Sequence, residues 1–374
     1  MRKIEQLAAP RRGLFVPEKT TLYARPLDLC CEGISSAAEI NDADRLLGGG
    51  PHRFHRIEII LRTNDHILAF AGPIDSLRGW AVEDGCLEEI DTAIYRLTRR
   101  RGPLLGWSLG RPLVMGIVNV TPDSFSDGID RSNQRAAISH AHSLIEAGAD
   151  LLDIGGESTR PGSRSVSPAE EINRVVPVIE KSVGFGVPIS VDTSKAVVME
   201  AAVAAGASIV NDVTALTGDP QSLGVVARAG VPVILMHMQG VPRNMQGDPK
   251  YDSAPLDVAD YLGARIAACE RAGVTANDLI VDPGIGFGKT DRHNLAILAR
   301  LGLLHGLGVP VMLGASRKSL IGRLSRDEGP EDRLGGSLGI ALSAVGQGVQ
   351  LLRVHDVAET NQALALRHAI LHAD

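Results

Sequence analysis

Polar side chains with the chemistry of a ligand site recur at the ends of short apolar segments in the last two thirds of the chain. Asp192, Asn211 and Asp282 each stand at such a position. A carboxylate accepts hydrogen bonds from N–H edges, and an asparagine both donates and accepts. Together these residues could bind the donor-rich edge of a flat heterocycle such as a purine or a pterin.

A second group of strand-end residues is basic. Arg317 and Lys318 follow one apolar segment, and Arg353 and His355 close the last one. Arginine offers a two-pronged fork for phosphate, and the loops after the last two strands of α/β barrels commonly form phosphate sites. The pattern predicts an anion site, with a solvated surface cluster as the alternative.

Two polar loops complete the candidate site. Residues 119–128 begin with Asn119 and are rich in oxygen donors suited to Mg2+, which usually takes only one or two protein oxygens beside substrate phosphates. Residues 155–162 place Thr159, Arg160 and Pro161 between glycines. This composition is typical of a loop that closes over a departing anion.

Residues 284–290 look like a phosphate-binding loop but lack its spacing. Pro283 stands where a Walker loop needs glycine, and only Phe287 separates two glycines where a dinucleotide fingerprint needs two residues. We therefore interpret the segment as a loop that follows Asp282, with Phe287 available to stack on a flat ring.

Eight apolar segments separated by helix-length stretches must position these residues. Eight strand–helix units in about 260 residues are typical of a (β/α)8 TIM barrel, in which all the strand ends meet at one face. A doubly wound open sheet is the structural alternative. The predicted strands are 113–120, 150–154, 188–191, 208–210, 232–236, 279–281, 310–313 and 349–354.

Start and stop signals for the helices support this reading. Ser167, Pro168 and Glu170 match an N-cap, a first-turn proline and a capping-box glutamate. Glycines placed to end a helix with positive φ precede most of the strands. These glycines are Gly148, Gly186, Gly206, Gly230, Gly308 and Gly348.

The first 107 residues are less regular. Segments 56–61 and 67–70 could form a hairpin, and 87–97 is an amphipathic helix followed by a basic linker at 99–101. We predict two parts: residues 1–107, a small α+β N-terminal extension of unknown function, and residues 108–374, the barrel domain.

Composition narrows the classes of function. The chain has 374 residues, a formal net charge of −6 and 3% aromatic residues, which argues against nucleic-acid binding. It contains no apolar run of about 18 residues and no secretory signal, so we expect no membrane partner. Its four cysteines lack metal-ligand spacing, which indicates a cytoplasmic protein.

The motifs resemble those of the dihydropteroate synthases, and the resemblance covers roughly residues 111–370. Members of that family are barrels that condense 6-hydroxymethyl-7,8-dihydropterin diphosphate with p-aminobenzoate, a step of folate biosynthesis that releases pyrophosphate. The matching segments are residues 115–128, 153–162, 192–195, 211–212, 236–240, 282–284, 316–319 and 353–357.

The resemblance implies a role for each site residue. Asp192, Asn211, Asp282 and Lys318 would hold the pterin, and Asn119 would help to bind Mg2+ and pyrophosphate. Arg353 and His355 would contact the phosphates. Thr159, Arg160, Pro161 and Ser316 would shape the p-aminobenzoate pocket. The resemblance also implies a homodimer and inhibition by sulfonamides, which mimic p-aminobenzoate.

These assignments imply a loose, dissociative displacement. Asp192 and Asp282 would favour the cation left on the pterin methylene, and Lys318, Arg353 and His355 would complete the catalytic set. Two other functions remain as alternatives. One is a pterin-dependent methyltransferase that transfers a methyl group to a corrinoid, and the other is a non-catalytic paralogue.

Overall fold

The computed structural model describes residues 1–31, 45–120, 131–159, 163 and 165–373. Eight parallel strands lie in the order β13-β12-β11-β10-β9-β8-β15-β14, and a parallel bridge between Val281 and Val311 joins the two ends. The strands are β8 (Leu113–Asn119), β9 (Leu151–Gly155), β10 (Ile189–Asp192), β11 (Ile209–Asp212), β12 (Val233–Met236), β13 (Leu279–Asp282), β14 (Met312–Leu313) and β15 (Leu351–Val354).

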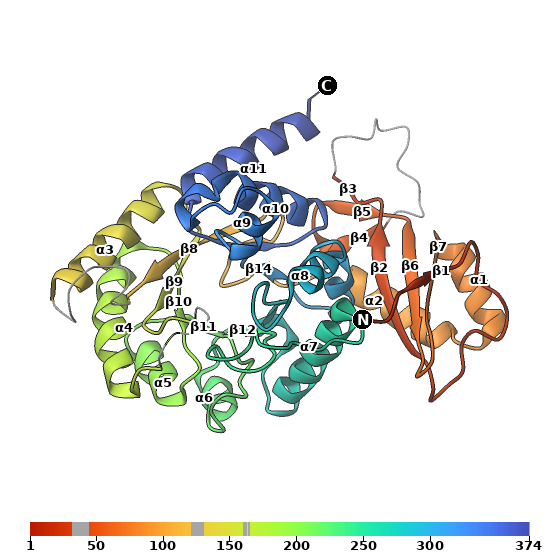
Figure 1. Ribbon diagram of the computed structural model, residues 1–374, viewed down its shortest axis with the longest axis horizontal. Helices are drawn as coiled ribbons and strands as arrows, with labels where there is room; N and C mark the ends of the chain where they lie inside the picture. The colour runs from red at the N-terminus through yellow and green to blue at the C-terminus, as the bar shows by residue number, and fades with distance from the viewer. Residues whose placement is uncertain (32–44, 121–130, 160–162, 164, 374) are drawn as a thin grey trace.

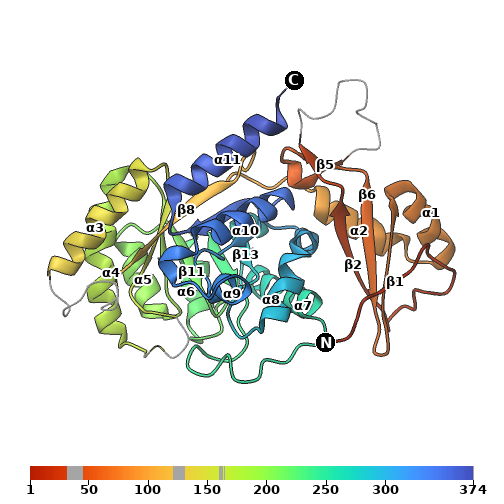
Figure 2. The ribbon, with the colours of Figure 1, turned by 45° about the horizontal axis from the view of Figure 1, so that its top comes forward.

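Helices between the strands surround this sheet (Figures 1 and 2). The prediction of a TIM barrel with an N-terminal extension is confirmed, and closure of the sheet excludes the doubly wound alternative. The helices are α3 (Arg131–Glu146), α4 (Pro168–Ser182), α5 (Ala196–Ala204), α6 (Ser222–Ala229), α7 (Ala254–Arg271), α8 (Asp291–Leu298), α9 (Ser319–Leu324), α10 (Leu334–Gly346) and α11 (Val357–Leu371).

The helix signals are largely confirmed. All six predicted stop glycines have positive φ, from 63° at Gly230 to 110° at Gly206. The Ser167 side chain accepts a hydrogen bond from the backbone N–H of Glu170 at the start of α4. The capping-box part of that prediction was wrong, because the Glu170 carboxylate instead accepts from Arg174 at 2.5 Å, one turn along the helix.

Residues before the barrel form a separate layer, which we call the N-terminal module. Its sheet has the order β1-β7-β6-β2, and the predicted hairpin is present with Ile59 opposite Phe70. The module contains β1 (Glu5–Gln6), β2 (Thr21–Leu27), β6 (Arg56–Arg62), β7 (Ile67–Pro73), α1 (Ile74–Asp84) and α2 (Leu87–Thr98), and a small sheet of β3 (Cys30–Cys31), β4 (Arg45–Leu46) and β5 (His52–Phe54).

The two faces of the module sheet pack on different partners. Ile57, Ile59 and Leu61 belong to a core within the module, together with apolar side chains of α1 and α2. Ile60 and Ile67 point the other way and join the core of the barrel. The alternation of a β-strand thus buries the sheet on both sides, and the barrel supplies one of its covers.

Residues between the module and the first barrel strand cover the amino end of the barrel. Leu104 and Trp107 form an isolated antiparallel bridge. Leu104 is 5% exposed and packs in a cluster with Leu113, Met115 and the corresponding residues of the other strands. This end of the barrel is therefore closed by apolar packing.

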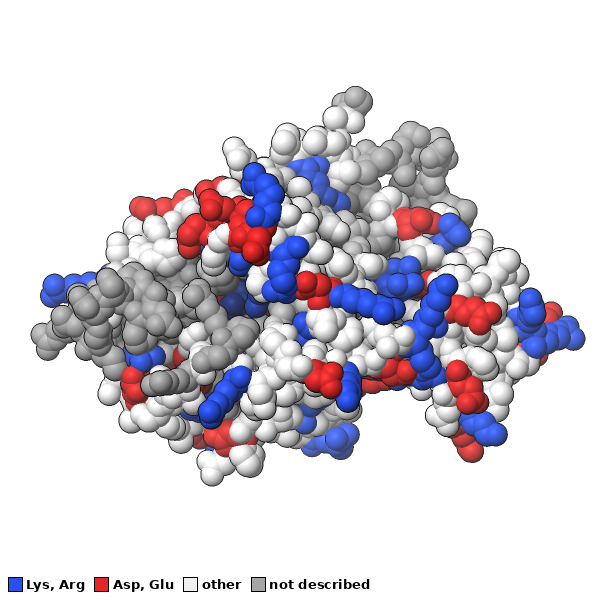
Figure 3. Space-filling model, in the orientation of Figure 1, with Lys and Arg blue, Asp and Glu red and all other residues white. Residues whose placement is uncertain are grey.

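The surface of the molecule carries both signs of charge. In Figure 3, lysine and arginine are interspersed with aspartate and glutamate on the face shown. Within the described residues, no helix combines the length and the apolar character needed to cross a membrane.

Candidate active site

The carboxyl ends of the strands bring together residues that are far apart in the sequence. Asp192 at the end of β10 is in register with Gly155 of β9 and with Asn211 of β11. Asp282 ends β13, in register with Met236 of β12. The strand-end pattern therefore converges on one face, as parallel strands of a barrel require.

Arg353 of β15 links two of these carboxylates. Its Nε donates to Asp153 Oδ2 at 2.5 Å, and its NH2 group donates to Asp192 Oδ2 at 2.8 Å. Asn211 Nδ2 donates to the same Asp153 oxygen at 3.0 Å. Asp153, which lies within β9 and is not among the site residues assigned from the sequence, thus binds both Arg353 and Asn211.

Burial dominates the electrostatics of this network. Asp192 lies beside Arg353, whose charge favours ionisation, but burial is the larger effect, and Asp153, Glu171 and Asp212 add repulsion, so the pKa of Asp192 rises to about 7. Burial likewise raises the pKa of Asp282. The site therefore holds carboxylates whose negative charge is poorly solvated, which suits a ligand that donates hydrogen bonds or carries positive charge.

Asp282 lies near enough to Arg353 for their charges to interact. Its Oδ1 accepts from the backbone N–H of Gly284 at 2.7 Å, which fixes the carboxylate at the start of the following loop. A Cβ added to Gly314 would lie 3.3 Å from Asp282 Oδ2 and 3.7 Å from Cδ of Arg353. The glycine thus leaves the space between the carboxylate and the guanidinium open.

Lys318 and Phe287 lie together beside this network. The Lys318 ammonium stands 4.1 Å from the centre of the Phe287 ring, which is a cation–π contact. Phe287 is also packed among Val213, Met236 and Met245, and little of it is exposed. Lys318 therefore already covers one face of the ring that we expected to stack on a ligand.

Ser316 and His355 form a second pair. Ser316 Oγ lies 3.1 Å from His355 Nδ1 and accepts from the His355 backbone N–H at 3.2 Å. Burial, with the nearby charges of Arg353 and Arg317, lowers the pKa of His355 to about 3. In the protein alone, His355 is consequently a neutral hydrogen-bonding group near pH 7 and not a cation.

Three strand-end residues serve the scaffold. The Asp212 carboxylate accepts from the backbone N–H groups of Thr214 and Leu216, in its own turn. Arg317 pairs with Asp356 and Glu331, so its charge is used within the loops. His237 is buried and its Nδ1 lies 2.8 Å from the Lys289 ammonium. Of these three residues, only Arg317 was predicted above as part of the anion site, and its guanidinium pairs with carboxylates of the protein instead.

Lys289 is a buried basic side chain that sequence reasoning missed. Its ammonium donates to the carbonyls of Gly284 and Phe287, both at 2.9 Å, and to that of His237 at 3.2 Å. Burial lowers the pKa of Lys289 well below its ordinary value. The only signal in the sequence was a lysine at the end of the glycine-rich loop, which the motif spacing had excluded from phosphate binding.

The two polar loops are described only in part. Thr159 follows β9 and is half-buried, whereas Arg160 and Pro161 lie outside the described residues. Glu157, at the start of that loop, binds the Lys195 ammonium at 2.8 Å and accepts from the backbone N–H of Val166 at 2.8 Å. These contacts hold both ends of residues 157–166.

Asn119 is the candidate metal ligand. It ends β8 on the same rim and is half-buried, and the rest of its loop, 121–130, lies outside the described residues. Within the described residues, no group of three acidic, histidine or cysteine side chains could hold a metal ion. A single amide oxygen beside substrate phosphates nevertheless fits Mg2+, which uses few protein ligands.

Comparison with known proteins agrees with this geometry. Residues 115–355 match the pterin binding enzyme family. The dihydropteroate synthase of Escherichia coli (strain K12) is 49% identical over 266 residues, which are 71% of this chain and 94% of that protein.

Solved structures are similar as well. The Xanthomonas albilineans dihydropteroate synthase with 4-aminobenzoic acid superposes with a TM-score of 0.67 at 51% identity, over 71% of this chain and 95% of that one. The same enzyme in complex with 7,8-dihydropteroate gives a TM-score of 0.65 at 48% identity, over 71% and 96% of the two chains.

These relatives are matched over nearly their whole length, whereas the family match in this chain begins only at residue 115. The N-terminal module is thus an addition to the part that they share. With a matching family pattern, close relatives and the same fold, the chain belongs to the dihydropteroate synthases, transferases of the pterin-binding TIM-barrel family.

Proposed function

We propose that the Asp153–Arg353–Asp192 network and Asp282 bind the pterin ring of 6-hydroxymethyl-7,8-dihydropterin diphosphate, the substrate that dihydropteroate synthases condense with p-aminobenzoate. The observation that carries this proposal is the set of buried carboxylates at one mouth of the barrel, with Asn211 and Lys318 beside them. A ring edge rich in N–H donors replaces the water that these carboxylates have lost and favours their ionised form.

Charge development then favours departure of the diphosphate. As the bond from the pterin methylene to the diphosphate breaks, positive charge spreads from the methylene into the ring, and Asp192 and Asp282 stabilise it. Arg353 is the nearby cation that opposes the negative charge on the leaving group. The neutral amine of p-aminobenzoate attacks the methylene carbon and loses its proton afterwards, so no strong base is required.

Asn119 would hold Mg2+ together with phosphate oxygens of the substrate. When bound, Mg2+ supplies positive charge that offsets the charge of the diphosphate. His355 contributes through hydrogen bonding, since burial keeps its imidazole neutral in the protein alone. The single ring N–H of the neutral imidazole and the hydroxyl of Ser316 are the hydrogen-bond donors for an anionic group of the substrates.

The p-aminobenzoate pocket is assigned to Ser316 and to the loop with Thr159, Arg160 and Pro161. Ser316 lies next to His355, and Thr159 follows the strand that carries Asp153. Sulfonamides mimic p-aminobenzoate, so they should compete with it at this position. We further propose that the protein acts as a homodimer in the cytoplasm, where the buried thiols of Cys86 and Cys269 stay reduced.

The test is pyrophosphate release by the full chain with Mg2+, the pterin diphosphate and p-aminobenzoate. Release should require p-aminobenzoate and should stop when Mg2+ is removed with a chelator. Release without p-aminobenzoate would contradict the coupling reaction. A corrinoid-dependent methyl-transfer assay on the same preparation should give no product, because the relatives are synthases and not methyltransferases.

A further inference from the structure

We propose that the N-terminal module positions Lys318 for pterin binding, together with the Phe287 ring that the Lys318 ammonium covers, by holding the segment between β12 and α7 through Arg62 and Arg2. This role goes beyond the shared barrel, because the relatives described above match it without the module. It rests on the proposed role of Lys318 in binding the pterin.

The module and the barrel meet at a network of charges beside the start of α7. Arg62, at the end of β6, pairs with Asp252 and Asp257 at 2.8 Å each and with Asp260 at 3.0 Å. The Arg62 side chain is 19% exposed. One arginine that serves three carboxylates in a partly buried network is expected to order them, unlike an isolated surface ion pair.

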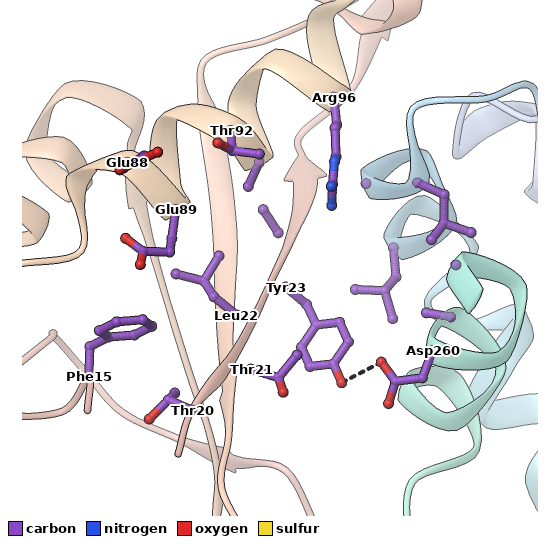
Figure 4. A pocket seen from close by; sticks show the side chains of 17 residues that line it. Phe15, Thr20, Thr21, Leu22, Tyr23, Glu88, Glu89, Thr92, Arg96 and Asp260 are labelled. Carbon is purple, nitrogen blue, oxygen red and sulfur yellow. Dashed lines mark hydrogen bonds between the residues drawn. The ribbon is translucent and has the colours of Figure 1, made fainter. Parts of the chain in front are cut away.

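Two further residues of the module reinforce the contact. Arg2 Nε donates to Asp252 Oδ1 at 2.6 Å, and Arg2 NH1 donates to the carbonyl of Asn64 within the module at 2.8 Å. Tyr23 donates its hydroxyl proton to Asp260 at 2.7 Å, across a groove of about 660 Å³ between the module and the barrel (Figure 4). The module thus holds the chain immediately before α7 and the first turns of the helix.

Tyr251 connects this network to the active site. It precedes Asp252 in the chain, is 7% exposed, and donates its hydroxyl proton to the carbonyl of Gly288 at 2.8 Å. A shift of Asp252 would therefore move the Tyr251 hydroxyl away from the loop that carries Phe287. The segment before Tyr251 reaches the same loop, since Gln246 Nε2 donates to the carbonyl of Gly286 at 2.6 Å.

The contacted loop has little freedom to adjust on its own. Gly284 and Gly288 have positive φ, and a Cβ at either position would lie 2.0 or 2.1 Å from the carbonyl oxygen of His237 or Gln239. The loops after β12 and β13 are therefore packed backbone against backbone. Lys318 stands over Phe287 at 4.1 Å, so the position of the loop sets the position of the ammonium.

The experiment is a double-mutant cycle in the full chain with Arg62→Ala and Tyr251→Phe. We expect Arg62→Ala to lower kcat/KM roughly 10-fold, mainly through a higher KM for the pterin diphosphate, because the loop that binds the ring loses its support. Tyr251→Phe should act in the same direction, and the double variant should lose little more than the more damaging single variant.

The matched control is Arg78→Ala, which breaks an exposed ion pair with Asp91 inside the module. It should leave KM unchanged, and its effect should add independently to that of Tyr251→Phe. Calorimetric binding of the pterin substrate to each variant gives a readout that does not depend on turnover. Unfolding midpoints well above the assay temperature would show that a changed KM does not reflect unfolded protein.

Two outcomes would overturn the inference while leaving the proposed function intact. One is an Arg62→Ala variant with wild-type KM and pterin affinity. The other is an effect of Arg62→Ala that multiplies fully with that of Tyr251→Phe, because it would then act by another route. Failure of the proposed function would look different, since wild-type protein and Lys318→Ala would then bind the pterin equally.

Discussion

The two ends of the barrel are built from the same eight strands and have opposite chemistry. At the carboxyl end, Asp153, Asp192 and Arg353 form a partly buried network of charges. At the amino end, the interior is apolar, and Leu104 covers a layer that includes Leu113 and Met115. The difference shows that the carboxyl end of each strand contributes to ligand binding, whereas the amino end contributes to the stability of the fold.

The two ends also contribute differently to the free energy of unfolding. Burial raises the pKa of Asp192 to about 7 and that of Asp212 to about 6, so the ionised carboxyl end costs stability at neutral pH. The amino end gains stability from apolar burial at every pH. An active site that is destabilised in this way is a common consequence of selection for binding.

The largest effect should come from Asp192→Asn at the carboxyl end. The amide keeps the shape of the side chain but removes the negative charge that stabilises the pterin cation, so kcat should fall by roughly 1000-fold, or about 4 kcal/mol. Steady-state pyrophosphate release measures this. Asp248→Asn, which changes an exposed ion pair with Lys250, should retain full activity. An active Asp192→Asn variant would remove Asp192 from the mechanism.

The next largest effect should come from the apolar packing at the amino end of the barrel. Leu104→Ala should lower the free energy of unfolding by about 3 kcal/mol, because it leaves a cavity over the apolar layer, and should change kcat by less than about twofold. Denaturant unfolding with an activity assay on the folded protein separates the two quantities. The neighbouring Leu105 is 39% exposed, so Leu105→Ala should be nearly neutral. A large loss of kcat in Leu104→Ala would mean that the two ends are coupled.

A smaller effect concerns the pH dependence of the free energy of unfolding, which should differ between the two ends of the barrel. Between pH values of about 4 and 7, folded protein binds more protons at Asp192 than the unfolded chain does, so this group makes the free energy of unfolding fall as the pH rises. Several histidines, such as buried His237 and half-buried His355, have lowered pKa values and act in the opposite direction below a pH of about 6.5. The free energy of unfolding of the wild-type protein, measured against pH, therefore contains the opposing contributions of Asp192 and of the histidines.

A comparison with the Asp192→Asn variant isolates the contribution of Asp192 to this pH dependence. Asp192→Asn should gain stability relative to wild type as the pH rises from 5 to 8, by about 2 kcal/mol. Guanidinium unfolding of both proteins at the two pH values gives the difference. A constant difference would show that the carboxylate has an ordinary pKa in the folded protein.

Much of the barrel could be predicted because its signals are local. Apolar runs, stop glycines and strand-end polar residues follow from the geometry of single strands and helices, and all eight strands were found. The direction in which a strand-end side chain points, by contrast, cannot be seen in the sequence pattern. Asp192 and Asp212 look alike in the sequence, but only Asp212 is taken up by the backbone N–H groups of its own turn.

The parts that could not be predicted depend on contacts between distant backbones. Lys289 binds three carbonyl groups, which every residue possesses, so nothing in the sequence marks its partners. Strand β2 was missed because Pro26 interrupts its pattern, although it pairs with β6 from Thr21 to Leu27. It is the edge strand of its sheet, where proline is tolerated.

The smallest predicted effect is that of Ser316→Ala, which asks how much one hydroxyl matters at the carboxyl end. Ser316 Oγ accepts from the His355 backbone and lies 3.1 Å from Nδ1, so its loss frees the imidazole to rotate. One neutral hydrogen bond is worth about 1 kcal/mol, which corresponds to roughly a fivefold loss of kcat/KM. If Ser316 shapes the p-aminobenzoate pocket, the loss should appear in KM for p-aminobenzoate and leave KM for the pterin unchanged.

Ser325→Ala, at an exposed serine that binds Glu328, is the matched control. A change in KM for the pterin alone would instead assign Ser316 to the ring, and would place the charged network and the hydroxyl pair in one binding unit.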